Sequence, residues 1–113
     1  MCAGCHTPRD PMSGFGPAGP LFSGENEAEE DKLNPGQEII PPNLTPDPTT
    51  GHIFAWTEDA FVARFKAGRV VKGSVMPWDA FQQMTETDVR SICRFLKSLP
   101  PVKHYVGATV RRN

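Results

Sequence analysis

The sequence predicts a small, mostly α-helical fold with long irregular loops. Two segments, 58–67 and 86–98, carry apolar residues at helical spacing between recognisable start and stop signals. The stretch 7–50 holds most of the twelve prolines, and no helical or strand periodicity persists there. The length of 113 residues suits one domain, so we expect a single domain over 1–113.

The first helix is predicted over 58–67. Thr57 suits the N-cap position, the acidic residues behind it suit the positive end of a helix, and Gly68 suits its end. Phe61 and Phe65 are four residues apart and therefore share one face.

The second helix is predicted over 86–98, between the N-cap candidate Thr85 and the helix-stopping Pro100. Its apolar stripe consists of Val89, Ile92, Cys93, Leu96 and Leu99. We expect Cys93 to be a small core residue rather than a reactive thiol. No strand pattern and no internal repeat is visible.

The composition leaves room for only a modest core, with 38% hydrophobic and 22% charged residues. A chain of this kind generally draws order from a disulfide, a metal or a prosthetic group. The net charge of −1 argues against nucleic acid as a partner, and no apolar run is long enough for a membrane span. A cluster of acids is interpreted as a solvated loop. It comprises Glu25, Glu27, Glu29, Glu30 and Asp31.

The pentapeptide CAGCH, residues 2–6, needs a chemical explanation. A disulfide between Cys2 and Cys5 leaves His6 unexplained. A zinc site needs four ligands, and the usual second Cys/His pair is missing. A thioredoxin-like motif lies between a strand and a helix, and neither is predicted around this stretch.

Covalent haem attachment accounts for all three residues. Each thiol adds to one vinyl group of the haem, and the histidine that follows supplies the proximal imidazole to iron. One helical turn separates the two thiols by about the distance between the vinyl groups. We therefore expect one haem c per chain, bound through Cys2 and Cys5, with His6 as an iron ligand.

An electron carrier commonly has a methionine sulfur opposite the histidine. The candidates are Met12, Met76 and Met84. Met12 lies only six residues beyond His6, which is too close to cross the haem ring. Met84 directly precedes the N-cap of the second helix, where a packing residue is usual. Met76 lies on an irregular stretch before Pro77, and we predict it as the sixth ligand.

Four stretches carry a resemblance that covers nearly the whole chain. They are CAGCHTPRD, NLTPDPTTG with the following Trp56, MPWDAFQQMT, and the helix ending in LKSLPPV. In this order they resemble a monohaem class I c-type cytochrome, specifically the cytochrome c modules of membrane-bound alcohol and gluconate dehydrogenase cytochrome subunits. The resemblance implies a small cytochrome c-like fold in which the ligand methionine precedes a proline, as Met76 does.

The resemblance also implies a helix before CAGCH that crosses the last helix, but only Met1 precedes Cys2. We therefore expect this N-terminal helix to be largely missing. The stripe of helix 86–98 would then expose Cys93, Phe95 or Leu96. We expect another chain, or a second copy of this one, to pack against it.

Aromatic residues are expected to form the wall of a haem pocket that keeps water from the iron. They are Trp56, Phe61, Trp78 and Phe81. By resemblance, residues 17–21 and the NLTPD segment wrap the propionate side. His52 is an alternative iron ligand, although a surface position in a loop is the commoner role.

The expected function is one-electron transfer without a substrate of its own. The redox partner is another protein, such as a dehydrogenase or a terminal oxidase. The alternatives are a haem-based enzyme or sensor with a labile methionine ligand, and an electron-entry fragment of a larger oxidoreductase. Haem c is attached outside the cytoplasm, so a periplasmic or extracellular location is expected, although no leader precedes Cys2.

Four cations gather within nine residues just before Met76, without an acid among them. They are Arg64, Lys66, Arg69 and Lys72. We expect this basic patch to steer an acidic partner toward the haem edge. The alternative is a solvated helix end whose cations suit the helix dipole.

Overall fold

The computed structural model describes residues 2–10, 16–17, 19–25, 28–31, 33–70, 74 and 76–112. The helices are α1 (Cys2–His6), α2 (Glu58–Lys66), α3 (Trp78–Gln82) and α4 (Glu86–Ser98). The strands are β1 (Arg9–Asp10), β2 (Gly16–Pro17), β3 (Glu29–Glu30), β4 (Gln37–Ile39) and β5 (Val110–Arg112). The prediction of a mostly α structure with long irregular loops is confirmed. Among the described residues, no helix is long and apolar enough to cross a membrane.

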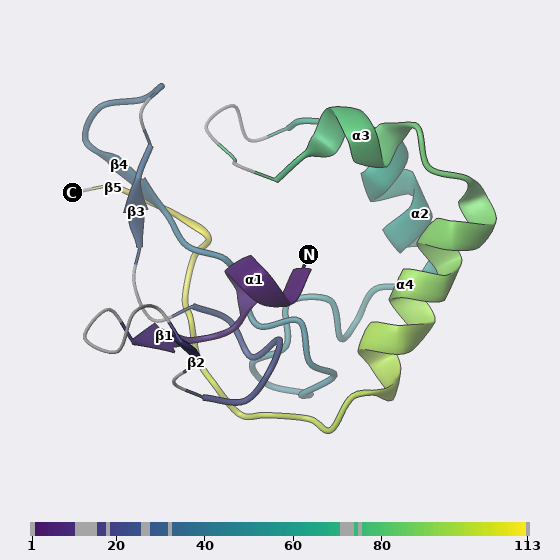
Figure 1. The fold of residues 1–113 in the computed structure, drawn as a ribbon, viewed down its shortest axis with the longest axis horizontal. Helices are drawn as coiled ribbons and strands as arrows, with labels where there is room; N and C mark the ends of the chain where they lie inside the picture. The colour runs from purple at the N-terminus through teal and green to yellow at the C-terminus, as the bar shows by residue number, and fades with distance from the viewer. Residues whose placement is uncertain are drawn as a thin grey trace.

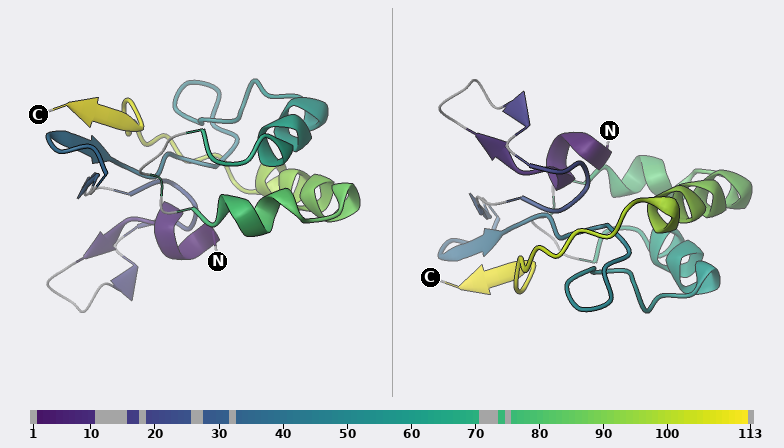
Figure 2. Two further views of the ribbon diagram at one scale, coloured as in Figure 1. Left: turned by 90° about the horizontal axis from the view of Figure 1, so that it is seen from above. Right: turned by 90° about the horizontal axis from the view of Figure 1, so that it is seen from below.

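Helices and strands occupy different sides of the molecule. The helices α2, α3 and α4 lie together on one side, the short strands lie on the other, and α1 lies between them (Figures 1 and 2). The strands form an antiparallel pair, β1 with β2, and an antiparallel sheet in the order β3-β4-β5. Strands of two or three residues are too short to show alternation, so no periodicity could predict them.

Both predicted helices begin at their predicted caps. The Thr57 hydroxyl accepts a hydrogen bond from the Ala60 amide at 3.1 Å, and the Thr85 hydroxyl accepts one from the Asp88 amide at 3.2 Å. Gly68, one residue beyond the C-cap of α2, has φ +74°, a conformation that favours glycine and ends the helix.

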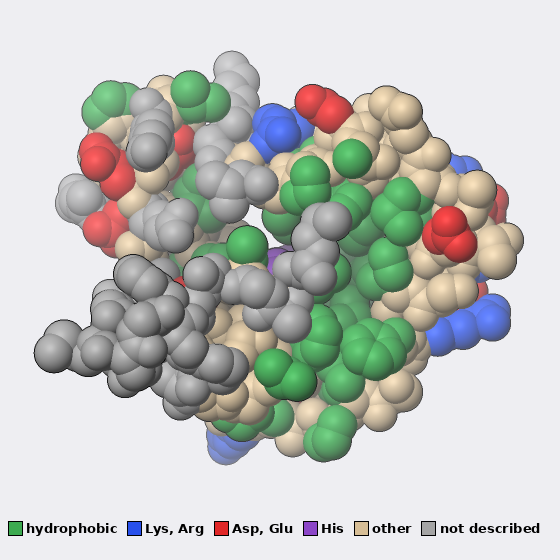
Figure 3. All heavy atoms as spheres, viewed as in Figure 1, with side chains coloured by type: hydrophobic (Ala, Val, Ile, Leu, Met, Phe, Trp, Pro, Cys, Tyr) green, Lys and Arg blue, Asp and Glu red, His purple; other side chains and the backbone are tan. Residues whose placement is uncertain are grey.

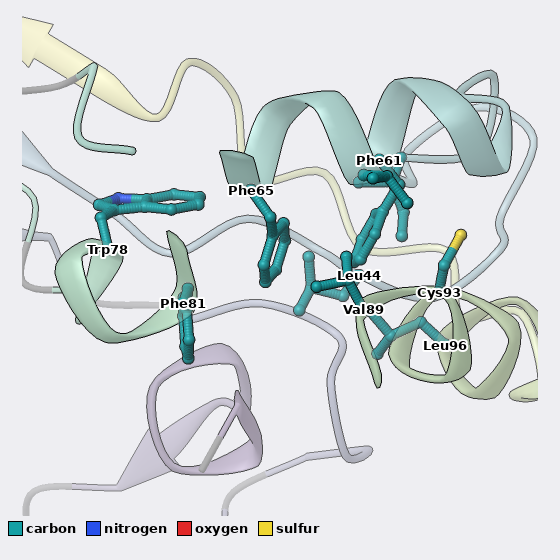
Figure 4. Packing of buried hydrophobic residues seen from close by; sticks show 10 residues of the cluster. Leu44, Phe61, Phe65, Trp78, Phe81, Val89, Cys93 and Leu96 are labelled. Carbon is teal, nitrogen blue, oxygen red and sulfur yellow. The ribbon is translucent and has the colours of Figure 1, made fainter. Parts of the chain in front are cut away.

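The core lies where α2 and α4 pack against each other, with α3 beside α2. The Phe65 ring stacks on Phe61 and Phe81, with ring centroids 4.7 and 5.3 Å apart, and contacts Trp78 edge-on (Figure 4). Aromatic pairs of this kind add to the free energy gained from burial. The single turn α3, which the sequence did not predict, supplies two of these four rings.

Much of the stripe of α4 is covered within the chain, although Ile92 and Leu99 are only half-buried. Val89, Cys93 and Leu96 are buried, and Cys93 is the core residue that the sequence predicted. Of the three residues named as candidates for exposure, Cys93 and Leu96 are thus buried, because α2 packs against α4. Phe95 does remain about half exposed, with its ring edge-on to Phe22.

The acidic cluster is not simply a solvated loop. Asp31 is only 1% exposed and accepts hydrogen bonds from the side chains of Asn34 and Gln37 at 2.9 and 3.0 Å. Glu25 is also buried, whereas Glu30 is exposed as expected. Glu27 and the side chain of Glu29 lie outside the described residues.

An ion cluster joins the outer faces of α2 and α4. The Arg90 guanidinium donates hydrogen bonds to Glu58, Asp59 and Glu86 at 3.1, 2.8 and 2.6 Å. Hydrogen bonds from Arg94 and then Arg90 lower the pKa of Glu58, and Arg90 lowers the pKa of Glu86. Carboxylates with a lowered folded-state pKa stabilise the fold above their unfolded-state pKa and lose this effect as the pH falls through the folded value.

Replacing Arg90 with Ala should lower the free energy of unfolding at pH 7, and the deficit should shrink in high salt and in acid. Salt screens exposed ion pairs, and protonation of the carboxylates in acid weakens in the unmodified protein the pairs that the variant already lacks. Denaturant unfolding measures this for Arg90→Ala and for Arg94→Ala, since the Arg94 guanidinium pairs with Glu58 alone among the described residues. A deficit that is equal at every pH and salt concentration would assign the effect to side-chain packing instead.

Candidate functional site

A cavity of about 330 Å³ lies between the helical side and the irregular side of the molecule. Figure 3 shows a hollow in this face, with a histidine at its base and hydrophobic side chains along one wall. The lining includes residues of α1, α2, α3 and α4, of β4 and the segment after it, and of the start of β5. Segments far apart in the sequence therefore build one site, and its lining is largely apolar.

The CAGCH stretch contributes one end of this cavity. It forms the short helix α1, in keeping with the one helical turn that haem attachment places between the thiols, and Cys2, Cys5 and His6 all line the cavity. Both cysteines are partly accessible thiols that are not joined in a disulfide, whereas His6 is only 5% exposed. Two accessible thiols and a buried imidazole thus face one apolar space.

The His6 imidazole is held in one orientation. Its Nδ1 lies 2.9 Å from the carbonyl oxygen of Pro42. A carbonyl oxygen only accepts, so Nδ1 carries the proton and Nε2 keeps a free lone pair in the neutral ring. Burial lowers the pKa of His6, against the opposing effect of the Pro42 hydrogen bond. The neutral form, which binds metals, is therefore favoured at pH 7.

The three methionine candidates differ in position. Met76 is half-buried and lines the cavity. Met84 is half-buried and packs against the hydrophobic core, but it is not part of the cavity lining. Met12 lies outside the described residues. The cavity therefore brings together His6 and Met76.

The alternative ligand His52 also borders the cavity. Its ring lies 5.5 Å from the Trp56 ring, and partial burial followed by the charge of Arg64 lowers its pKa. His52 is exposed to solvent, in keeping with the surface role expected for it.

The predicted pocket wall is present around the cavity. The four aromatic residues expected there, Trp56, Phe61, Trp78 and Phe81, all line it. Phe65, Ile40 and Ile53 line it too, although they were not predicted as part of the pocket wall. Of the NLTPD segment, Leu44 reaches the cavity, while the polar residues Asn43 and Thr45 are fully buried.

The predicted basic patch is only partly exposed. Arg64 is half-buried at the cavity wall, with its guanidinium 3.8 Å over the Trp78 ring, and desolvation lowers its pKa. Lys66 is exposed and lies 3.6 Å from Glu86, and Arg69 is exposed and donates to the Ser74 carbonyl. Lys72 lies outside the described residues. Arg64 thus lines the cavity.

Sequence alone did not reveal the hydrogen-bond acceptor of His6. Pro42 lies 36 residues beyond His6, and no local pattern connects them. Within the described ranges, no three His, Cys, Asp or Glu side chains are grouped so as to hold a metal ion. A metal at His6 would therefore need further donors, which a prosthetic group or a methionine sulfur can supply.

No family model matches the chain. It is similar to the cytochrome c subunit of the quinone-type alcohol dehydrogenase from Gluconacetobacter polyoxogenes and to that from Komagataeibacter europaeus. Each is 33% identical over 116 aligned residues, which cover 89% of this chain and 22% of the relative. The chain thus spans about a fifth of the length of these relatives. The resemblance seen in the sequence is confirmed: the chain is related to a cytochrome c module of these dehydrogenase subunits.

Proposed function

We propose that this protein is a one-electron carrier with a single, covalently attached, His/Met-ligated haem c. The observation that carries the proposal is that Cys2, Cys5, His6 and Met76 line the same apolar cavity. In this assignment the two thiols hold the haem covalently, and His6 and Met76 are the two iron ligands. The relationship to cytochrome c subunits supports it.

Each group of the chain has a defined task in this proposal. When bound, haem c supplies a reversible one-electron couple at iron. His6 offers its Nε2 lone pair because Pro42 holds the Nδ1 proton. The aromatic wall excludes water from the cavity, and a dry, apolar site favours the less charged reduced state.

The proposal makes the chain an electron carrier rather than a catalyst. If His6 and Met76 both bound the iron, no small molecule could bind it without displacing Met76. The rival function, a haem enzyme or a gas or peroxide sensor, needs a labile methionine.

Carbon monoxide should therefore leave the visible spectrum of the reduced protein unchanged at neutral pH. Met76→Ala opens the site and should acquire a carbon monoxide complex under the same conditions. Titration of both proteins, followed by absorption spectroscopy, tests this. Rapid formation of the complex in the unmodified protein would favour the enzyme or sensor.

The remaining assignments follow from the same relationship. We propose that residues 1–113 form one cytochrome c-like domain that works outside the cytoplasm, where haem c is attached. Its partner is a dehydrogenase or a terminal oxidase, and the chain could also work as the electron-entry module of a larger oxidoreductase. The named relatives, cytochrome c subunits of a dehydrogenase, favour the dehydrogenase as partner.

Two exposed cations, Lys66 and Arg69, are the described remainder of the basic patch. Changing both to Glu should slow reduction by a purified quinone-type alcohol dehydrogenase at low salt, because charge mainly affects association rate. The effect should fade at high salt, with the reduction potential little changed. Stopped-flow kinetics test this, with Lys103→Glu as the control variant. An unchanged rate at low salt would leave the patch as a solvated surface.

A further inference from the structure

We propose that Asn43 is a positioning residue for His6. Asn43 connects residues 102–104, which follow α4, to the segment that carries the Pro42 carbonyl. This carbonyl accepts the hydrogen bond of the His6 imidazole, so its position affects the reduction potential of the haem. This inference rests on the proposed function, because the potential belongs to a haem iron bound by His6.

Asn43 is fully buried, and both ends of its amide are engaged. Its Nδ2 donates to the carbonyl of Val102 at 2.8 Å. Its Oδ1 accepts from the backbone amide and the hydroxyl of Thr45 at 2.9 and 2.7 Å. The backbone partners on each side fix which way the amide points.

Further hydrogen bonds extend this connection along the segment after α4. The hydroxyl of Thr45 accepts from the Val102 amide at 3.1 Å, and the hydroxyl of Thr50 accepts from the His104 amide at 3.0 Å. Residues 102–104 are thus joined to 43–50 by side chains that are themselves buried or half-buried. A buried network in which every group is paired rigidifies its surroundings.

Pro42 directly precedes Asn43, so this network also holds the Pro42 carbonyl oxygen, which accepts the hydrogen bond from His6 Nδ1. Backbone bonds hold the same stretch on both flanks: the Glu25 amide donates to Pro41 at 3.1 Å, and the Leu44 amide donates to Phe22 at 2.8 Å.

The loop 22–25 also contacts the backbone of His6. The Gly24 amide donates to the backbone carbonyl of His6 at 2.6 Å. A Cβ on Gly24 would lie 2.8 Å from the Asn43 backbone nitrogen, so the contact requires glycine. The backbone of His6 and its Nδ1 acceptor therefore belong to one packed unit centred on Asn43.

The expected consequence is electronic as well as structural. An N–H···O bond from the far nitrogen raises the basicity of a ligating imidazole. A more basic ligand favours the oxidised iron, so a lengthened Nδ1–H···O bond should raise the potential. A role limited to stability would leave the potential unchanged.

The test compares Asn43→Ala with Asp31→Ala. Asp31 is equally buried and accepts several hydrogen bonds, but its partners lie in its own turn. Both variants should unfold at lower denaturant concentration. Only Asn43→Ala should raise the potential, and only in it should the His6 Nδ1–H proton signal of the reduced protein shift upfield and exchange faster with solvent.

A milder pair covers the case in which Asn43→Ala does not fold. Thr45→Val removes the hydroxyl that bonds Asn43 and should shift both readouts in the same direction, by less, while Thr45→Ser should restore the values of the unmodified protein. If the reduction potential and the His6 Nδ1–H signal are unchanged in these variants while stability falls, Asn43 contributes to stability only. Failure of the unmodified protein to bind haem would instead refute the proposed function.

Discussion

Replacing Met76 with Ala is expected to abolish the weak sulfur-to-iron charge-transfer band in the far red and to lower the reduction potential. A thioether ligand favours reduced iron, so its loss favours the oxidised state. Absorption spectra of the oxidised protein and potentiometry measure the two effects. Met76 lines the cavity beside Pro77, which makes it the methionine best placed for this role.

Met84→Leu is the matched control, because Met84 packs against the core and is not part of the cavity lining. Leucine is close to methionine in volume, so this change should cost less than about 1.5 kcal/mol of stability. The band and the potential should be nearly intact. The opposite pattern, with the band lost in Met84→Leu and kept in Met76→Ala, would make Met84 the ligand.

The second large effect is expected at the cysteines. With Cys2 and Cys5 both changed to Ala, no thioether can form, so any haem should pass completely into acidified organic solvent. Each single variant should keep one thioether and give a pyridine haemochrome band between those of the doubly attached and free haem.

Cys93→Ala is the control for this pair, because Cys93 is buried in the core and does not line the cavity. It should lose some stability and keep the haem attached through both thiols. Retention of haem by the Cys2→Ala, Cys5→Ala double variant after solvent extraction would show that the attachment is elsewhere.

Local signals in the sequence predicted most of the helical structure. The caps Thr57 and Thr85 and the stop at Gly68 lie within a few residues of the groups that they satisfy, so short-range chemistry specifies them. The turn α3 and the short strands were missed because too few residues repeat for a period to show. Their formation depends on the core and the cavity wall.

The site was predictable only in part. CAGCH is recognisable in the sequence, because two cysteines and a histidine at this fixed spacing suit covalent haem attachment. No local pattern predicts the roles of Pro42 and Asn43, since their partners His6 and Val102 lie 36 and 59 residues away in the sequence. The roles of Asp31 and Arg64 were misjudged for the same reason. A charged residue in a sequence is expected to be exposed to solvent, and only the folded structure shows which charged side chains are buried.

An intact mass combined with a pyridine haemochrome spectrum tests the central claim most directly. The protein should be produced where haem-attachment machinery is present and then denatured before both measurements. The proposal predicts the mass of the chain plus one haem, and the spectrum of a haem attached through two thioethers. A mass equal to the bare polypeptide, with no haem spectrum or with haem that washes away, would contradict it.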